Sequence, residues 1–264
     1  MNCNIMLWIL CLAAAVGTEN DARINPSVRS LNSPALCFYA SFDNGQISAD
    51  TAAGEPEPIN VKGNPEFKVG IWGKSLYMQD GEIIFDRTGN MPTASASGTL
   101  CFWICPSEWD MDSSDQRNVT FFRANLPYSG ITRQGGKTEN KVNKRDKMLV
   151  FYCNRKIRNT QKVESLQIAD DFMKNDKWIF ISLRWTPQWI NLCINAAPPG
   201  SQFGLNQRKE YSSPMSTLET SGPQTFSFCF EKPMSLDEVL IFNRILSDKE
   251  LTSLYSSLAH IVNP

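Results

Sequence analysis

The sequence contains a single histidine, His260, and no C-x-x-C pair among its cysteines. Structural zinc sites are built from histidine and cysteine at short, regular spacings, so a zinc site is not expected. A Ser-His-Asp nucleophile system is not expected either, because His260 lies close to the C-terminus and no motif partner accompanies it. The sequence therefore offers neither of these two kinds of chemistry.

An excess of positive charge is also lacking, since the formal net charge at pH 7 is −1. A nucleic-acid-binding protein needs a basic face to neutralise phosphates, so nucleic acid is not an expected partner. Beyond the N-terminus, no apolar run approaches the length of about 18 residues that a membrane span requires. The aromatic fraction of 11% and the charged fraction of 20% are typical of an ordered globular domain.

The N-terminus carries the one long apolar run. Residues 5–16 contain no charge, and Ala15-Val16-Gly17 places small residues just before a polar segment. A run of this length is typical of a signal peptide. Residues 1–17 are therefore predicted to be a signal peptide and residues 18–34 a polar lead-in. This predicts a secreted, periplasmic or cell-surface protein.

Removal of the signal peptide leaves six cysteines, and each lies in an apolar, strand-like run. An even number of cysteines in an exported chain permits disulfides, but sequence alone does not decide their pairing. Free cysteine also behaves as a small core residue. Our interpretation is one or two disulfides together with buried thiols. The six residues are Cys37, Cys101, Cys105, Cys153, Cys193 and Cys229.

Short runs rich in aromatic and β-branched residues recur along the chain, bounded by glycine, proline, asparagine and aspartate. Such runs are typical of β-strands, and helical periodicity is nearly absent. The pattern predicts an all-β sandwich of two layers. The runs are residues 35–42, 75–78, 82–85, 99–105, 119–123, 148–153, 178–185, 189–194, 225–230 and 236–242.

One helix is predicted near the C-terminus. Ser247-Asp248-Lys249-Glu250 is a capping box, in which the serine and glutamate satisfy each other's main-chain amides. An apolar stripe follows, formed by Leu251, Leu254, Tyr255 and Leu258. By contrast, residues 110–147 form a polar insertion, in which only the run at 119–123 is predicted to be a strand and the rest solvated loops.

Several segments resemble, in order, the laminin-G-like jelly-roll family of the concanavalin A-like lectin and glucanase superfamily. The most specific is Ser235 to Leu251, which is similar to the family's closing "I-D-E-V-R-I-Y-N-R-A-L-S-D-x-E-I" almost position by position. The resemblance implies a two-sheet antiparallel jelly-roll sandwich over residues 35–264, with a short C-terminal helix. The other segments are Phe42 to Gly45, Gly70 to Leu76, Gly98 to Pro106 and Trp178 to Ala196.

Members of this family often bind calcium on the side of the sandwich away from the sugar face. Carried over by position, the resemblance implies Asp43 and Asp237 as calcium ligands, because hard carboxylate oxygens suit this ion. The alternative is that Asp43 caps a turn and Asp237 serves strand geometry.

A lectin role needs aromatic rings that stack on the C–H faces of sugars. Trp109, Trp185 and Trp189 are the candidates, because nearby proline and polar residues place them near strand ends. Packing in the core is the alternative for all three. Trp103 shares a strand face with two cysteines and is predicted to be a core residue.

A glycoside hydrolase of the superfamily would carry "E-x-D-x-x-E" on one strand, so that the carboxylates share a face. Glu108-Trp109-Asp110-Met111-Asp112 has the two-residue spacing, but Ser113 stands where the last glutamate belongs. We interpret this segment as a solvated acidic turn, and no enzyme is predicted. The predicted function is an exported, non-catalytic module that binds a glycan or cell-surface polysaccharide. The first alternative is a structural or protein-interaction domain, and the second is a polysaccharide-cleaving enzyme.

Overall fold

The structure is a computed structural model. It describes residues 28, 34–93, 95–109, 118–125, 128–134, 148–157, 160–169, 172–201, 205–211 and 224–262. Within these ranges, the side chains of residues 125, 128, 153–164, 169 and 260–262 are left out of the description. The predicted signal peptide lies outside the described residues.

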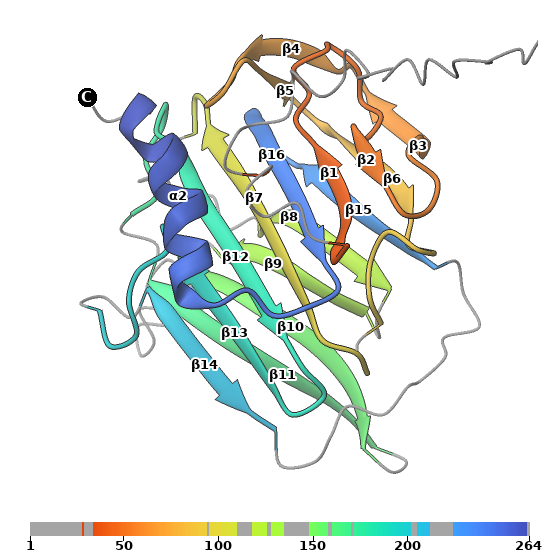
Figure 1. The fold of residues 1–264 in the computed structure, drawn as a ribbon, viewed down its shortest axis with the longest axis vertical. Helices are drawn as coiled ribbons and strands as arrows, with labels where there is room; N and C mark the ends of the chain where they lie inside the picture. Colours follow the sequence, from red (N-terminus) through yellow and green to blue (C-terminus); the bar gives the residue numbers. More distant parts are fainter. Residues whose placement is uncertain are drawn as a thin grey trace, which may run out of the picture.

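The described residues form two antiparallel sheets and one C-terminal helix, α2 (Figure 1). Sheet A consists of β1 (Leu36–Ala40), β2 (Thr51–Ala52), β4 (Glu66–Val69), β5 (Lys74–Met78), β7 (Gly98–Pro106), β12 (Ile179–Trp185), β13 (Trp189–Ile194), β14 (Asn206–Glu210) and β16 (Met234–Phe242). Sheet B consists of β3 (Pro58–Gly63), β6 (Gly81–Asp86), β8 (Val119–Asn125), β9 (Tyr128–Gln134), β10 (Met148–Ile157), β11 (Thr160–Ala169) and β15 (Thr225–Phe230). Helix α2 spans Asp248–Val262.

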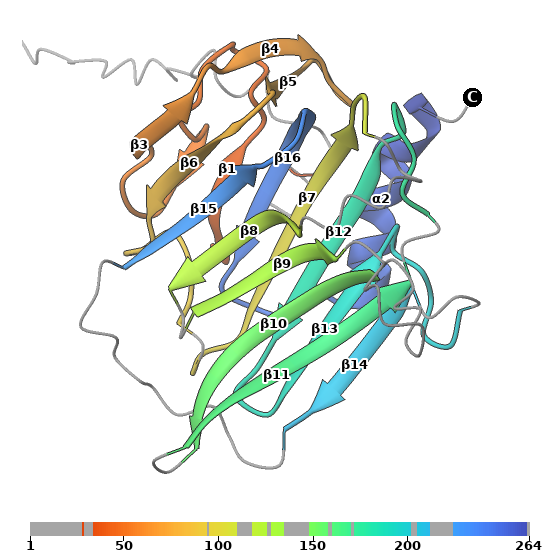
Figure 2. The same ribbon diagram turned by 180° about the vertical axis from the view of Figure 1, so that it is seen from behind.

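Strands distant in sequence are neighbours in both sheets. Sheet A has the order β14-β13-β12-β7-β16-β1-β2, with β5 paired to β16 and β4 paired to β5. Sheet B has the order β11-β10-β9-β8-β15-β6-β3. The sheets face each other, and α2 lies on the outer face of sheet A (Figures 1 and 2). This confirms the predicted two-sheet antiparallel sandwich with a C-terminal helix.

Every run predicted to be a strand contains one. The interpretation of residues 110–147 needs correction, because Tyr128–Gln134 forms β9 rather than a solvated loop. Strands β2, β3, β4, β11 and β14 were also not predicted. All five lie at sheet edges, where polar side chains remain exposed and the apolar signal of a strand is weak.

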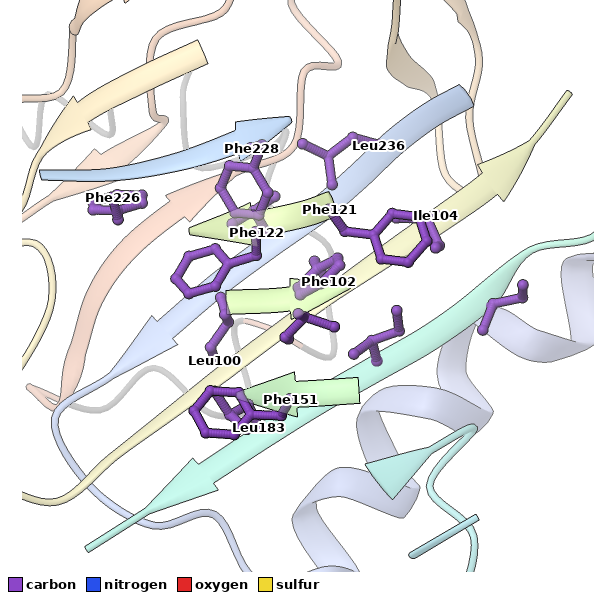
Figure 3. Close-up of a cluster of buried hydrophobic side chains, with 14 of the residues drawn as sticks. Leu100, Phe102, Ile104, Phe121, Phe122, Phe151, Leu183, Phe226, Phe228 and Leu236 are labelled. Carbon is purple, nitrogen blue, oxygen red and sulfur yellow. The ribbon is translucent and has the colours of Figure 1, made fainter. Parts of the chain in front are cut away.

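The main core lies between the sheets and is formed largely by aromatic residues. Phe102 of β7 meets Phe228 of β15 edge to face, with ring centroids 5.6 Å apart. Figure 3 shows the same inward packing for Phe121 and Phe122 of β8. Both of these rings are buried although they are adjacent in sequence, because a register shift interrupts the pairing of β8 with β9 between Thr120 and Phe122.

A second core lies between sheet A and α2. Trp103 of β7 is 1% exposed and stacks on Tyr255 of α2, with centroids 5.5 Å apart and an interplanar angle of 11°. Phe180 of β12 packs on the same indole at 5.1 Å. The predicted helical stripe completes this core, since Leu251 and Leu254 are buried. Trp103 is therefore a core residue, as predicted.

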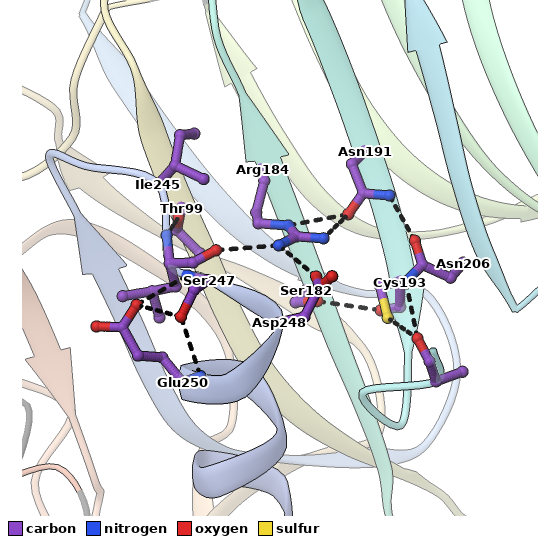
Figure 4. Close-up of polar contacts among 12 residues, drawn as sticks. Thr99, Ser182, Arg184, Asn191, Cys193, Asn206, Ile245, Ser247, Asp248 and Glu250 are labelled. Atoms are coloured by element: carbon purple, nitrogen blue, oxygen red, sulfur yellow. Dashed lines mark hydrogen bonds and ion pairs between the residues drawn. The ribbon is translucent and has the colours of Figure 1, made fainter. Parts of the chain in front are cut away.

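A buried arginine fixes the start of α2 on sheet A. The Nε and Nη2 atoms of Arg184 donate hydrogen bonds of 3.0 and 2.7 Å to Asn191 Oδ1 (Figure 4). Its Nη1 atom donates to the Leu246 carbonyl at 3.0 Å and pairs with Asp248 Oδ1 at 2.7 Å. The network joins β12, β13 and the first turn of the helix.

The capping box forms as predicted. Ser247 N donates to Glu250 Oε2 at 2.8 Å, and Glu250 N donates to Ser247 Oγ at 3.3 Å. Arg244 also hydrogen-bonds Glu250 Oε1 at 2.6 Å. The bond from Arg244 is the largest of the effects that hold the pKa of Glu250 down to about 2.

Replacing Glu250 with glutamine is expected to lower the free energy of unfolding at pH 7 by about 1 kcal/mol. Because the pKa of Glu250 is depressed in the folded state, its contribution is complete above the ordinary value of 4.5 and is lost as the pH falls towards 2. Denaturant titrations of both proteins at several pH values measure this. The difference between them should shrink over that window, and a constant difference would contradict the assignment.

The described cysteines are free thiols. Cys37, Cys101, Cys105, Cys193 and Cys229 are not joined in any disulfide, so the expectation of one or two bridges is not met among these five. The side chain of Cys153 lies outside the description. Burial raises the pKa of the Cys193 thiol to about 11 and that of Cys229 to about 12. These cysteines act as small core side chains, which is the other role that their apolar surroundings predicted.

Among the described residues, no helix combines the length and the apolar character needed to cross a membrane.

Candidate functional site

The two aspartates predicted as calcium ligands lie on either side of one turn, Gly70 to Lys74. The turn is closed by a hydrogen bond from Gly70 N to the Gly73 carbonyl at 3.0 Å. Ile71 N donates to Asp237 Oδ2 at 2.8 Å, and Lys74 N donates to Asp43 Oδ1 at 2.7 Å. The β4–β5 turn is thus held by carboxylates from two other segments of the chain.

The two glycines of this turn leave room for the carboxylates. A Cβ atom at Gly70 would collide with Asp237 Oδ2, and one at Gly73 would collide with Asp43 Oδ1. Gly73 also has a φ of 55°, in the left-handed region that favours glycine. The close approach of the two aspartates therefore requires glycine at positions 70 and 73.

Asp237 begins a bulge in the centre of sheet A. Asp237 and the next residue, Glu238, are both 0% exposed, and Glu238 has a φ of 49°. Tyr39 donates from its hydroxyl to the Glu238 carboxylate, at 3.1 Å to the nearer oxygen. Burial raises the pKa of Asp237 well above its ordinary value, and the neighbouring charges of Glu238 and Asp43 raise it further.

The oxygen atoms of Asp43 and Asp237 decide whether this site fits a calcium ion. Calcium takes roughly six to eight oxygen ligands. The Oδ1 and Oδ2 atoms of Asp237 already accept hydrogen bonds from Glu238 N and Ile71 N, and Asp43 Oδ1 accepts one from Lys74 N. The described residues contain no group of three or more histidine, cysteine, aspartate or glutamate side chains that could hold a metal.

These carboxylate oxygens are arranged to hold the turn rather than to surround a calcium ion. Calcium binding at Asp43 and Asp237 stays a prediction of the sequence. It is tested by the melting temperature with and without calcium chloride, because an ion that binds the folded state raises it.

The three tryptophans proposed for sugar stacking lie in different environments. Trp109 is 3% exposed, stacks on Phe121 and donates from Nε1 to the Pro233 carbonyl at 2.6 Å. Trp185 is 4% exposed and donates to the Thr93 carbonyl at 3.3 Å. Both rings belong to the core between the sheets, which leaves no face open for a sugar.

Trp189 is half-buried at the start of β13. The guanidinium of Arg208 lies 4.2 Å from the centre of its ring, and Arg208 also pairs with Glu210. Among the described tryptophans, the exposed one is Trp72, with 39% of its surface open. Trp72 lies in a tight turn bounded by two glycines, and this pattern in the sequence could have predicted that its side chain is exposed.

The acidic segment weighed as a glucanase motif is described only in part. Glu108 is exposed and has a φ of 59°, while the ring of Trp109 is buried beside it. Asp110 and Asp112 lie outside the described residues.

The outer face of sheet B presents a row of polar side chains across the strands. Cross-strand pairing aligns Ser165, Tyr152, Gly130, Arg123 and Ser227 in register from β11 to β15. Tyr152 lies directly over Gly130, because a Cβ atom there would be 2.7 Å from the tyrosine hydroxyl oxygen. The phenol is half-buried. No described helix or strand crosses this face (Figure 2).

A charged network lies beside this row. Lys62 Nζ pairs with Glu82 Oε2 at 2.9 Å, and Arg123 Nη2 pairs with Glu231 Oε1 at 2.8 Å. Ser227 Oγ donates to Glu82 Oε1 at 2.8 Å. Burial acts to raise the pKa of Glu82, but the hydrogen bonds from Lys62 and Ser227, together with the positive charges of Lys62 and Arg123, outweigh it and leave the pKa lowered. Glu82 therefore stays ionised on this face at neutral pH.

Solved structures share the fold. The binding domain of botulinum neurotoxin serotype D is 14% identical over 84% of this chain and 51% of its own, with a TM-score of 0.59. The serotype D ligand-binding domain in complex with N-acetylneuraminic acid gives 14% identity, 84% and 50% coverage and a TM-score of 0.60. The binding domain of botulinum neurotoxin DC in complex with SialylT is 16% identical over 85% of this chain and 51% of its own, with a TM-score of 0.57.

The chain spans about half the length of these neighbours. Because the sequence identity is low, the structural match shows a similar fold and nothing more. No protein-family model matches the chain, and no curated protein sequence matches it. Among the described residues, α2 covers the outer face of sheet A, whereas no helix or strand lies on the outer face of sheet B.

The sequence did not single out Tyr152, because it lies in an apolar run that predicts a buried strand. The alternation of that strand places Tyr152 on the face opposite Phe151, which is 4% exposed. Its partner Gly130 belongs to β9, which was not predicted, so the pairing of ring and glycine could not be derived.

Proposed function

We propose that this chain is an exported, non-catalytic recognition module that binds carbohydrate on the outer face of sheet B. The observation that carries the proposal is the ring of Tyr152 lying over Gly130, in line with Arg123, whose Nη1 atom lies 3.9 Å from Oε1 of the ionised Glu82. We further infer that the sandwich is of the laminin-G-like type, on the strength of its closing segment, Ser235 to Leu251.

This face combines the groups that a sugar needs. An aromatic ring offers an apolar surface to the C–H bonds of a sugar, and a tyrosine keeps a hydroxyl for hydrogen bonding. The arginine and glutamate supply donors and acceptors that distinguish hydroxyl positions. Because these side chains are held on paired strands, little order has to be gained when a ligand binds.

The structural neighbours support the same class of ligand. Two of them are described in complex with N-acetylneuraminic acid and with SialylT. Because each neighbour is about twice as long as the matching region, they support the ligand class and do not assign residues.

The proposal predicts that Tyr152→Ala lowers the affinity for glycans recognised by the wild-type protein by roughly tenfold, the loss expected when one stacking ring is removed. A glycan array identifies the ligands, and calorimetry with the strongest one measures the change. Trp189→Ala is the matched control, since it removes an aromatic ring from sheet A.

Two outcomes would refute the site or the function. If Trp189→Ala lowers the affinity and Tyr152→Ala does not, then sugar binds at the edge of sheet A. If the folded wild-type protein binds no glycan on the array, the carbohydrate function is wrong. The protein-interaction alternative would then be the one to pursue.

A further inference from the structure

Two exposed apolar side chains lie at the tip of the β4–β5 hairpin. Val69, the last residue of β4, is 87% exposed, and Trp72 in the turn is 39% exposed. The third large apolar side chain exposed among the described residues is Ile59 at 56%, which lies on β3 in the other sheet. The hairpin lies at one end of the long axis of the molecule, in both views (Figures 1 and 2).

The tip is held rigidly although it is exposed. Asp237 accepts the Ile71 amide at 2.8 Å, and Asp43 accepts the Lys74 amide at 2.7 Å. Ile71 itself is 1% exposed and anchors the turn in the core under α2. Trp72 is thus flanked by fixed residues, and its exposure follows from the geometry of the turn. A preformed tip loses little entropy on contact with a partner.

The charged side chains that the hairpin exposes next to the turn are positive. Lys68 and Lys74 flank it and are exposed, and no acidic residue occurs between Glu66 and Asp80. The Lys68 ammonium lies 2.9 Å from the centre of the Tyr77 ring. Two carboxylates, Asp43 and Asp237, contact the turn itself, and each accepts a hydrogen bond from a main-chain amide there.

We propose that this hairpin tip docks on the surface of a bilayer that contains anionic phospholipid. Tryptophan is enriched at the membrane–water interface, because its ring prefers the apolar side while its N–H stays hydrated. The aliphatic side chain of Val69 would enter the acyl boundary, and the two lysines would meet the negative headgroups.

A bilayer fits this tip better than a sugar does. A sugar site places acceptors and donors beside the ring to select hydroxyl positions, whereas the other large apolar side chain exposed at this tip, Val69, offers neither. One short hairpin with two lysines gives reversible attachment, because stable anchoring needs more apolar area or a second signal.

Vesicle co-sedimentation tests the proposal with the full processed chain. Vesicles of phosphatidylcholine with phosphatidylserine should bind the protein more strongly than vesicles of phosphatidylcholine alone. The double change Val69→Ser and Trp72→Ser should weaken binding to the anionic vesicles by about tenfold or more, because two apolar side chains no longer leave water. Ile59→Ser is the matched control and should leave binding unchanged.

Two further measurements keep the proposal falsifiable. Val69→Glu changes a side chain that is almost wholly exposed, so it should fold normally and still lose binding to anionic vesicles. Brominated acyl chains should quench the tryptophan fluorescence of the wild-type protein, and Trp72→Phe should remove that quenching.

Three outcomes would overturn the proposal. They are absence of vesicle binding by the wild-type protein, equal loss with Ile59→Ser, and unchanged binding with Val69→Glu. Tyr152→Ala should still bind vesicles, so the proposal is independent of the glycan site. A glycan affinity that falls in the tip variants while vesicle binding is absent would assign the tip to sugar instead.

Discussion

Replacing Trp103 with alanine is expected to lower the free energy of unfolding by about 3 to 5 kcal/mol, the cost of removing a large buried ring. Trp103 is 1% exposed and contacts Tyr255 of α2 on one side and Phe180 of β12 on another. The cavity would lie between sheet A and the helix, so α2 should lose much of its packing. Denaturant unfolding followed by tryptophan fluorescence and by far-ultraviolet circular dichroism measures both effects.

The matched control is Tyr255→Phe, which keeps the stacked ring and removes only its hydroxyl. Because Tyr255 is half-buried, this change should cost less than about 1 kcal/mol. A cost below about 1 kcal/mol for Trp103→Ala as well would mean that α2 contributes little to the stability of the sandwich.

The strands could be predicted where both faces of a strand are buried. The central residues of β7 and the last four residues of β16 form continuous apolar runs, because they pack on the main core on one side and on α2 on the other. Strands β11 and β14 could not be predicted in the same way. They are edge strands, and β14, Asn-Gln-Arg-Lys-Glu, contains no apolar residue. Its place in the sheet depends on pairing with β13 rather than on its own pattern.

The candidate sites were less predictable than the fold, because exposure is a tertiary property. Trp109 and Trp185 stand near strand ends in the sequence, as a rim residue would, but both rings turn into the core. Trp72 and Tyr152 occur in segments that read as a turn motif and as a buried strand. The family resemblance implied Asp43 and Asp237 as calcium ligands, and the structure places both carboxylates at the turn between β4 and β5, where they accept main-chain amides.

The closing segment links the fold to the proposed membrane contact. Asp237 of β16 lies opposite Trp103 of β7 and holds the turn that exposes Trp72. The bulge at Asp237 and Glu238 interrupts the pairing with β7, so main-chain amides and carboxylates meet inside the sheet. The central strand therefore controls the shape of a surface feature on the neighbouring hairpin.

Asp237→Ala is accordingly expected to lower the free energy of unfolding by about 2 to 4 kcal/mol. The carboxylate is 0% exposed and accepts the amides of Ile71 and Glu238 at 2.8 Å each. Alanine would leave both amides buried without an acceptor, and each such loss costs roughly 1 to 3 kcal/mol, offset in part by the relief of burying a charge. Denaturant titration measures the stability, and vesicle co-sedimentation measures whether the tip still binds.

Asp43→Ala is the matched comparison, because Asp43 is half-buried and accepts one amide of the same turn, from Lys74. It should cost about 1 kcal/mol, clearly less than Asp237→Ala. Asp237→Asn keeps an uncharged acceptor at the same position and should fall between the two. If Asp237→Ala proves no more costly than Asp43→Ala, then the turn is held by the packing of Ile71 rather than by the buried carboxylate. The rigidity of the exposed tip would in that case need a different explanation.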